Sequence, residues 1–426
     1  MNNFTPIQKL EVFRRLADGN KVKVGILAQN KNAVYFQYDI EYLKASHNLS
    51  PFKLSFNGKL QEAIKLPHQG LQGVFADSLP DGWGLLLMDR IFRRHGVLPQ
   101  QLTMMDRLAY IGDRGMGALE YAPISAYAPK RDNALINIYE LGQEAQEIFE
   151  GQTNEVLTQL ANAGSSGGAR PKAQIYIHPD NLTQANTIYQ EGLQPWLVKF
   201  TSQSLALGHE ESLCEAAYLK MAHHAGIDVP EYQLITPPQD SNAIAWLALR
   251  RFDCTDKGRY HLHSLCGLLD ADFRTPSLDY DDIIKASQVL CNSPAVGQTM
   301  FARAIFNLFS LNQDDHSKNW AFLMDDIGKW KPSPFYDITF SPNPHNEHST
   351  AFMGYGNTPP LKAIQQMAKQ ANFGTWKQAQ EVIQKIVNSI QEWHQISSAF
   401  NISLQTRNMI EKQLKDVWQQ NKKLCV

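Results

Sequence analysis

The chain has 426 residues, of which 43% are hydrophobic and 19% charged, and its formal net charge is −2. This length allows two or three domains around a large core, and the near-neutral charge argues against an autonomous nucleic-acid-binding protein, which would carry clustered Lys and Arg. The five cysteines are scattered without a C-x-x-C pair, as expected for buried thiols in a reducing compartment. We find neither a signal-peptide pattern nor an apolar run of roughly 18 residues that would span a bilayer. We therefore expect a cytoplasmic protein without a membrane partner.

The first part of the chain predicts a small module of mixed helix and strand. Residues 6–17 predict a helix, because their apolar side chains recur at helical spacing: Ile7, Leu10, Phe13 and Leu16. Alternating apolar residues over 22–26 predict a strand, and residues 33–38 predict its hairpin partner. A turn with the sequence Phe-Ala-Asp-Ser-Leu-Pro-Asp-Gly-Trp-Gly, residues 75–84, leads into a predicted helix over 85–95. We interpret this part as an α+β domain of its own.

A loop of small residues follows a predicted linker and helix. Residues 164–172 read Gly-Ser-Ser-Gly-Gly-Ala-Arg-Pro-Lys and precede an extended run, 173–177. Small side chains let backbone N–H groups approach a phosphate, and Arg170 and Lys172 add positive charge. The segment matches neither G-x-x-x-x-G-K-[ST] nor G-x-G-x-x-G. An ordinary solvent-facing turn therefore remains the alternative interpretation.

The next two elements place a lysine and a glutamate among apolar residues. Lys199 lies in a predicted strand, 196–200, and Glu215 lies in a predicted helix, 210–225, that ends at Gly226. A charge within an apolar segment is costly unless it is paired. In a kinase-type site, such a strand lysine holds the α- and β-phosphates of the nucleotide, and a glutamate on a helix pairs with it. The alternative is an edge strand with Lys199 in water.

A predicted strand over 246–253 runs into a polar turn, where a protein kinase has the segment that links its two lobes. Backbone groups of such a segment would bind adenine, which indicates nucleotide-binding residues here: Arg250, Arg251 and Phe252. His261 and His263 alternate as in a strand and have no Cys or carboxylate cluster near them in the sequence. We therefore do not predict a metal site at these histidines.

The most informative segment follows a predicted helix over 301–311. Asp314 and Asn319 are five residues apart, the spacing of a protein-kinase catalytic loop, in which the Asp orients the attacking hydroxyl and the Asn holds Mg²⁺. Asp337 follows eighteen residues after Asn319. A polar loop without a catalytic role is the alternative interpretation. Either Asp315 points into the site beside Asp314, or it faces a backbone amide or water. The remainder, about residues 359–421, predicts amphipathic scaffold helices.

Taken in order, these segments resemble the HipA family of bacterial serine/threonine kinases, the toxins of type II toxin–antitoxin modules. The resemblance covers nearly the whole chain. Its most specific parts are the Leu-Pro-Asp-Gly-Trp-Gly turn at 79–84, Asp314-x-His316-x-Lys318-Asn319 and Phe335-Tyr336-Asp337-Ile338. It implies an α+β, protein-kinase-like two-lobed fold with an additional small N-terminal α+β subdomain and a mainly helical C-terminal lobe. The implied domains are the N-terminal subdomain (1–125), an N-lobe-like region (126–252) and the C-lobe (253–426).

The resemblance also implies a role for each candidate residue. Asp314 would be the catalytic aspartate, and Asn319 and Asp337 would hold Mg²⁺. Lys199 would clamp the phosphates of ATP, with Glu215 fixing it in place. The other residues implied to bind the nucleotide are Ser166, Gly167, Gly168, Ala169, Arg170, Lys172, Arg250, Arg251, Phe252, His316 and Lys318.

A serine in the phosphate-binding loop of this family can be autophosphorylated, which expels the loop and silences the kinase. Ser165 occupies that position, and the adjacent Ser166 could substitute for it. A phosphate adds about −1.5 to −2 charge, which would repel the triphosphate of ATP.

The implied function is that of an ATP-dependent serine/threonine protein kinase that acts as a toxin on a translation-related protein. The implied partner is a helix-turn-helix antitoxin, and DNA would be contacted only through that antitoxin. Two alternatives remain: a non-catalytic co-repressor that binds an antitoxin on DNA, and a kinase of a small molecule.

Overall fold

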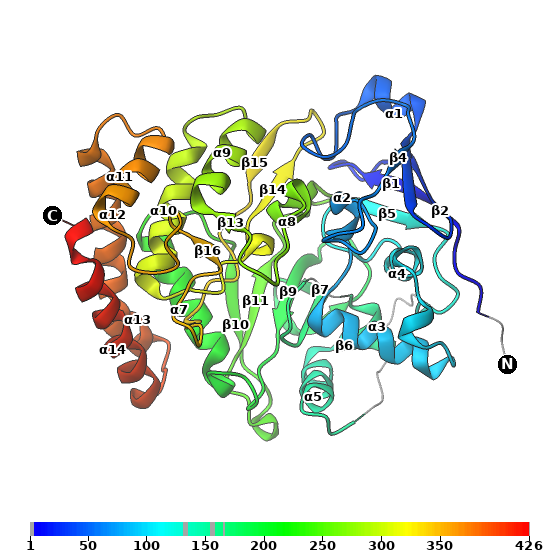
Figure 1. The fold of residues 1–426 in the computed structure, drawn as a ribbon. Helices are drawn as coiled ribbons and strands as arrows, with labels where there is room; N and C mark the ends of the chain where they lie inside the picture. Colours follow the sequence, from blue (N-terminus) through cyan, green and yellow to red (C-terminus); the bar gives the residue numbers. More distant parts are fainter. Residues whose placement is uncertain (1–3, 131–134, 154–157, 165–166, 426) are drawn as a thin grey trace. The chain divides into compact units, whose positions relative to one another are not determined.

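The computed structural model describes residues 4–130, 135–153, 158–164 and 167–425. The chain divides into two compact units (Figure 1). The N-terminal unit comprises Met1–His209, Ile235–Asp270 and Leu323–Lys329, and the C-terminal unit comprises Glu210–Leu234, Ala271–Phe322 and Trp330–Val426. Within the described residues, no helix combines the length and apolar composition that crossing a membrane requires.

An antiparallel sheet forms the first part of the N-terminal unit. Its strands lie in the order β4-β3-β2-β1-β5. Their bounds are β1 Lys9–Arg15, β2 Lys21–Gln29, β3 Val34–Tyr38, β4 Gln61–Glu62 and β5 Leu119–Ala122. The predicted hairpin is confirmed, because β2 and β3 pair antiparallel from Gly25 and Tyr38 to Gln29 and Val34.

The helix predicted over 6–17 is wrong, because this segment forms strand β1. Burial alternates along it: Leu10, Val12 and Arg14 are buried and the residues between them are not, which is the period of a strand. The alternation of apolar residues was not visible in the sequence, because the buried position 14 is occupied by a charged residue, Arg14. Its guanidinium donates to the carbonyls of Met324 at 3.3 Å and Asp325 at 2.9 Å, so the charge is compensated by residues more than 300 positions away.

A second sheet in the N-terminal unit carries the predicted phosphate-binding segments. Five of its strands lie in the order β11-β9-β7-β8-β6. Their bounds are β6 Ile136–Asn137, β7 Lys172–His178, β8 Asn181–Asn186, β9 Gln194–Lys199 and β11 Trp246–Arg250. The strands predicted over 173–177, 196–200 and 246–253 are thereby confirmed as β7, β9 and β11. β9 lies between β7 and β11 and pairs antiparallel with both.

Helices pack on this second sheet through an apolar core. Trp83 and Phe92 of α3 and Leu141 of α5 share this core with Ile175 of β7 and Val198 of β9. α3 confirms the helix predicted over 85–95 and begins earlier, at Gly82. The helices of the N-terminal unit are α1 Ile40–Ala45, α2 Gly73–Ala76, α3 Gly82–Arg94, η1 Pro99–Gln101, α4 Met104–Ile111, α5 Ile138–Phe149, α6 Thr158–Asn162, η3 Gln239–Ser241 and α8 Leu265–Leu269.

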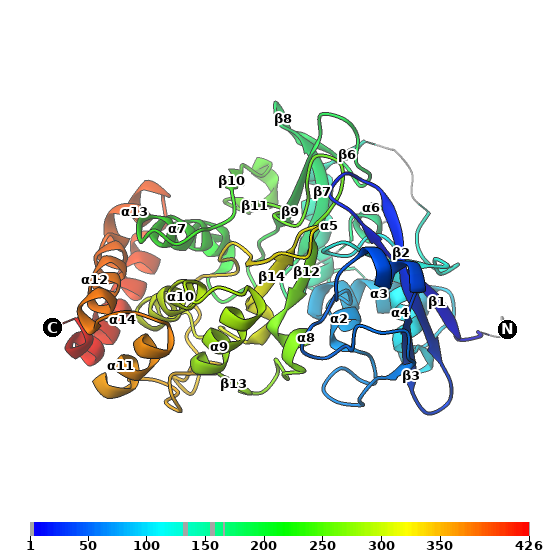
Figure 2. The same ribbon diagram turned by 90° about the horizontal axis from the view of Figure 1, so that it is seen from above.

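The C-terminal unit is mainly helical. Its helices are α7 Glu211–His224, α9 Tyr280–Leu290, α10 Val296–Ser310, η4 Ser317–Asn319, α11 Leu361–Gln370, α12 Trp376–Gln391, α13 Trp393–Ala399, α14 Leu404–Asn421 and η5 Lys422–Leu424. They confirm the helices predicted over 210–225, 301–311 and 359–421. Figure 2 shows α7 and α10 among α12, α13 and α14, and the phenol of Tyr218 in α7 donates to the carbonyl of Ser310 at the end of α10, at 2.8 Å.

The remaining elements are short. β13 (Leu278–Asp279) and β16 (Thr350–Ala351) of the C-terminal unit pair in parallel. β12 (His261–Ser264) belongs to the N-terminal unit. Three further elements contain a boundary between the two units: η2 (Gly208–Glu210), β10 (Tyr232–Ile235) and β14 (Ala321–Met324). β15 (Trp330–Pro332) begins at another boundary and belongs to the C-terminal unit.

Candidate functional site

The loop predicted from the Asp-x-x-x-x-Asn spacing lies in the C-terminal unit, directly after α10. The helix ends where Leu311 takes a left-handed conformation, with φ 56°. Asn319, at the end of η4, donates from Nδ2 to the backbone carbonyl of Asp314 at 2.7 Å. The loop therefore closes on itself, and two residues five apart in the sequence lie side by side. We call residues 314–319 the catalytic loop, after the role predicted for it.

The side chain of Asp314 is 63% exposed and lies beside one basic residue, His316. The Nε2 atom of His316 lies 3.7 Å from its carboxylate. The ammonium of Lys318 lies over the ring of Phe273, 4.1 Å from its centroid, and the same ring contacts His316. The structure thus places His316 beside Asp314, and His316 and Lys318 against the same ring. An exposed carboxylate can accept a hydrogen bond from an incoming hydroxyl, and the neighbouring basic groups suit a phosphate.

Asp337 lies on a segment that runs alongside the catalytic loop. The phenol of Tyr336 donates to the carbonyl of Lys318 at 2.7 Å, and Asn312 and Ser341 form a parallel bridge. Asp337 itself has φ 57°, a left-handed conformation that Asp adopts more readily than most residues. The structure therefore holds the segment of Asp337 against the loop that carries Asn319.

The donor atoms of Asn319 and Asp337 fit Mg²⁺. Since Nδ2 of Asn319 is used on the carbonyl of Asp314, the carboxamide oxygen is the atom with which Asn319 would bind a cation. Asp337 adds carboxylate oxygens. Mg²⁺ takes hard oxygen ligands, and beside a nucleotide it commonly uses one or two protein groups together with phosphate oxygens.

Two lysines of the N-terminal unit are neighbours in its second sheet. Lys172 of β7 and Lys199 of β9 are direct partners in the antiparallel register, so their side chains leave the sheet on the same face. Both residues are buried. The ammonium of Lys172 donates to the carbonyl of Gly167 at 2.6 Å. Two lysines that are neighbours in the sheet, beside a glycine-rich loop, suit the binding of phosphate oxygens. Ser165 and Ser166 lie outside the described residues.

The turn before α3 contacts the predicted phosphate-binding loop, and sequence reasoning missed this contact. The carboxylate of Asp81 accepts a hydrogen bond from the backbone N–H of Gly168. The backbone N–H of Trp83 donates to the carbonyl of Gly168 at 3.1 Å, and its indole N–H donates to the carbonyl of Lys172 at 2.9 Å. The sequence signal was Gly82, whose φ is +39°. A Cβ on Gly82 would lie 2.6 Å from the Cα of Ala169.

This contact predicts the effect of Gly82→Ala. The new methyl group would meet the backbone at Gly168 and Ala169 at 2.8 Å or less, so the loop must move. We expect a lower melting temperature and a smaller stabilisation by Mg-ATP, both measured by thermal unfolding. Gly96→Ala is the matched control, because Gly96 also has a positive φ but has nothing within 4 Å of its added Cβ. Equal stabilisation by Mg-ATP in both variants would contradict the prediction.

Arg251 is used within the fold. Its guanidinium forms a buried ion pair with Asp253 at 2.6 Å and donates to the side chain of Gln174 at 2.7 Å. Burial raises the pKa of Asp253, but the charge and hydrogen bond of Arg251, together with Arg259 and the N–H of Gly117, outweigh it and hold this pKa below its usual value. The guanidinium of Arg250 lies 5.7 Å from the centroid of the Trp196 ring. The nucleotide-binding role of Arg250, Arg251 and Phe252 therefore stays a prediction for their backbone groups.

Glu215 lies in α7 of the C-terminal unit, and Lys199 lies in β9 of the N-terminal unit. Glu215 is 1% exposed, on a helix whose residues are buried on nearly all sides. A buried carboxylate requires polar or charged partners. The predicted pairing of Lys199 with Glu215 stays a prediction.

The two histidines of β12 belong to buried hydrogen-bond networks of the N-terminal unit. Nδ1 of His263 lies 2.6 Å from the carboxylate of Asp77, and its Nε2 lies 3.0 Å from Oγ of Ser50. This order resembles the triad of a serine hydrolase. However, Ser50 is 1% exposed, so no substrate carbonyl can reach its hydroxyl. Nε2 of His261 meets the carbonyl of Leu49 at 2.9 Å. That these histidines are not metal ligands stays a prediction.

The Asp77 pair predicts a pH-dependent contribution to stability. Burial raises the pKa of Asp77, but hydrogen bonds from His263 and Ser264 outweigh it, so the pKa lies below its usual value. The contribution is therefore present above about pH 4, the unfolded value, and is lost as the pH falls through the folded pKa. We expect Asp77→Asn to lower the free energy of unfolding by about 1.5–3 kcal/mol at pH 7, and by less at pH 3.5. Urea unfolding measures the free energy of unfolding at both pH values, with Asp256→Asn as control because Asp256 is exposed. An equal loss of free energy at pH 7 and pH 3.5 would contradict the prediction.

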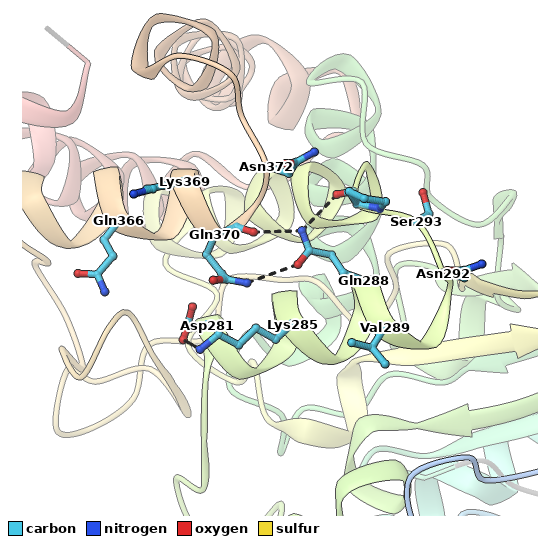
Figure 3. A pocket seen from close by; sticks show the side chains of 11 residues that line it. Asp281, Lys285, Gln288, Val289, Asn292, Ser293, Gln366, Lys369, Gln370 and Asn372 are labelled. Atoms are coloured by element: carbon cyan, nitrogen blue, oxygen red, sulfur yellow. Dashed lines mark hydrogen bonds and ion pairs between the residues drawn. The ribbon is translucent and has the colours of Figure 1, made fainter.

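A polar groove of the C-terminal unit lies between α9 and α11 (Figure 3). Its lining polar groups bind one another: Gln288 donates to the carbonyl of Gln370 at 3.0 Å, and Lys285 forms an ion pair with Asp281. None of the predicted site residues lines this groove. The groove therefore gives no indication of the reaction.

Comparisons with known protein families match two parts of the chain. The model of the HipA N-terminal domain matches residues 18–122, and that of the HipA-like C-terminal domain matches residues 164–394, more than half of the chain. The chain belongs to the HipA family. Membership covers both the turn that precedes α3 and the catalytic loop. A comparison with curated proteins found no match.

A solved structure confirms the predicted HipA-type fold. A chain of the HipA, HipB and operator DNA complex of the toxin–antitoxin system of Shewanella oneidensis MR-1 is 16% identical, with a TM-score of 0.69 and coverage of 96% of each chain. The proinflammatory kinase CtkA of Helicobacter pylori is 12% identical, with a TM-score of 0.36 over 55% of this chain and 89% of that one. The α+β, kinase-like two-lobed fold predicted from the sequence is thus confirmed by the HipA match.

Proposed function

We propose that this chain is an ATP-dependent serine/threonine protein kinase and the toxin of a type II toxin–antitoxin module. The observation that carries the proposal is the closed catalytic loop of a HipA family member: Asn319 binds the carbonyl of Asp314, and the carboxylate of Asp314 is exposed to an acceptor. Phosphoryl transfer needs mainly positioning and charge neutralisation. The residues assembled around this loop suit both.

In this proposal, Asp314 orients the acceptor hydroxyl and takes its proton as the oxygen attacks the γ-phosphorus of ATP. The bond from the γ-phosphorus to the bridging oxygen breaks, and ADP leaves. Lys199, Lys172 and the N–H groups of the loop after Gly167 hold the phosphates, as the placement of the two lysines supports. Mg²⁺, held by Asn319 and Asp337, would neutralise charge on the phosphates.

We further propose a protein acceptor that is related to translation, and autophosphorylation at Ser165 as the means of silencing the enzyme. The partner would be a helix-turn-helix antitoxin that carries the complex to DNA in the cytoplasm. The related HipA structure contains HipB and operator DNA, which supports this choice of partner.

The test is transfer of label from γ-labelled ATP, with Mg²⁺, to the chain itself and to proteins of a bacterial lysate. We expect labelled phosphoserine or phosphothreonine in a protein. Label found only in metabolites would support a small-molecule kinase. Binding to an antitoxin–DNA complex without any transfer of label would support the co-repressor instead.

A further inference from the structure

The two neighbouring carboxylates of the catalytic loop lie in opposite environments. The side chain of Asp314 is 63% exposed, whereas that of Asp315 is fully buried. Removing a carboxylate from water costs several kcal/mol unless hydrogen bonds or charges compensate it. Asp315 must therefore be held by specific partners, and the structure shows which.

Three donors surround the carboxylate of Asp315. The phenol of Tyr280, the first residue of α9, donates to Oδ2. Nδ1 of His348 lies 2.8 Å from the same oxygen, and the backbone N–H of Thr350 in β16 donates to Oδ1 at 3.2 Å. Burial, and next the charge of Asp315, raise the pKa of Tyr280 well above its usual value, so the phenol keeps the proton that it donates.

The backbone of Asp315 is held as well. Its carbonyl accepts from Oγ1 of Thr350 at 2.6 Å and from the indole N–H of Trp320 at 3.1 Å. Trp320 directly follows the catalytic loop, and Thr350 belongs to the β13–β16 pair at the start of α9. Through its main chain and its side chain, Asp315 therefore fixes the loop to β16 and α9.

The hydrogen bonds continue from Tyr280 back to Asp314. Nδ2 of Asn307 donates to the phenol oxygen at 3.0 Å, and Nδ2 of Asn312 donates to Oδ1 of Asn307 at 2.8 Å. Oγ of Ser341 donates to Oδ1 of Asn312 at 2.9 Å, and the N–H of Asp314 makes a long bond of 3.4 Å to that hydroxyl. Both asparagines are buried. The chain of bonds thus leaves the loop at Asp315 and returns to it at Asp314.

We propose that Asp315 is a positioning residue for phosphoryl transfer: through Tyr280 and His348 it fixes the backbone on which Asp314 presents its carboxylate. This inference rests on the proposed kinase function. A displacement of about 1 Å at a reacting group can cost about 100-fold in rate. Because Asp315 and Asp314 share a peptide bond, a shift of the first moves the second.

The main test is Asp315→Asn, which keeps the shape of the side chain but replaces one acceptor oxygen by a donor. That donor would face the donors of Tyr280, His348 or Thr350. We expect kcat for phosphorylation to fall by about 10- to 100-fold, with KM for Mg-ATP changed less than about threefold, since the residues proposed to hold the phosphates are not replaced. Activity is measured below the melting temperature of the variant.

Asp77→Asn is the matched control, since Asp77 also pairs with a histidine, His263, but lies in the N-terminal unit. We expect it to lower stability and leave kcat unchanged. A purely structural Asp315 would behave in the same way, so a wild-type kcat in Asp315→Asn overturns the inference. A wild-type chain that transfers no phosphate would instead overturn the proposed function.

A second variant keeps the inference testable if Asp315→Asn does not fold. Tyr280→Phe preserves the ring contacts with Trp320 and Phe352 but removes the hydroxyl that links Asp315 to Asn307. We expect a lower kcat with a nearly constant KM. In the double variant with His348→Gln, the losses in kcat should not multiply, because both residues act through Asp315. A wild-type kcat in Tyr280→Phe, or fully multiplicative losses, would overturn the inference.

Discussion

Asp314→Asn should abolish phosphoryl transfer while leaving the fold and the binding of Mg-ATP nearly intact. The carboxylate is exposed, and Asn319 binds the backbone carbonyl of Asp314 rather than its side chain, so the amide can replace it without breaking the loop. An amide cannot take the proton of the acceptor hydroxyl. Loss of such a general base costs about 10²- to 10⁴-fold in rate. The measurement is the initial rate of label transfer from γ-labelled ATP.

Asp416→Asn is the control for this variant, because Asp416 is exposed on α14 of the same unit. It should transfer phosphate at the wild-type rate. Thermal unfolding with and without Mg-ATP shows whether Asp314→Asn still folds and binds. A variant that phosphorylates at the wild-type rate would refute the assignment of Asp314, and with it the interpretation of the catalytic loop.

The candidate site was predictable where the determining contacts are local. Asp314 and Asn319 are joined by one hydrogen bond across a six-residue loop. Their spacing in the sequence was therefore enough to predict that the two residues lie side by side. The same holds for the strand of Lys199, because an apolar run with one charge has a local pattern. Asp315 was left open between two environments, and the structure confirms the one in which it faces a backbone amide, that of Thr350. Its other side-chain partners, Tyr280 and His348, are 35 and 33 positions away, and no spacing rule connects them to Asp315.

Long-range contacts explain what sequence reasoning missed. β1 was predicted as a helix because the buried position of Arg14 depends on carbonyls of residues 324 and 325. The turn at Asp81 was recognised as unusual, but its partner Gly168 is 87 positions away, and only the fold brings the two together. Where a polar group is compensated by a distant segment, its burial leaves no periodic signal in either segment. Sequence patterns therefore do not reveal such contacts.

Lys199→Met is expected to weaken the binding of Mg-ATP by roughly 10- to 150-fold. Methionine keeps most of the aliphatic length that β9 buries and removes the ammonium. A hydrogen bond to a charged group contributes about 1.5–3 kcal/mol, which corresponds to that change in Kd. Lys172, the direct neighbour in the register, would still bind the phosphates, so binding is reduced rather than abolished.

Thermal unfolding gives the measurement. Ligand at 100 times its Kd stabilises the folded state by about 2.7 kcal/mol, a shift of about 3 °C for a chain of this length. At the ligand concentration that produces this shift in the wild type, Lys199→Met should show about half of it or less. Lys23→Met is the control, since Lys23 is a half-exposed lysine of β2 paired with Glu11, and it should keep the full shift. A full shift in Lys199→Met would exclude Lys199 from the phosphate site. The absence of any shift in the wild type would instead show that the chain does not bind Mg-ATP.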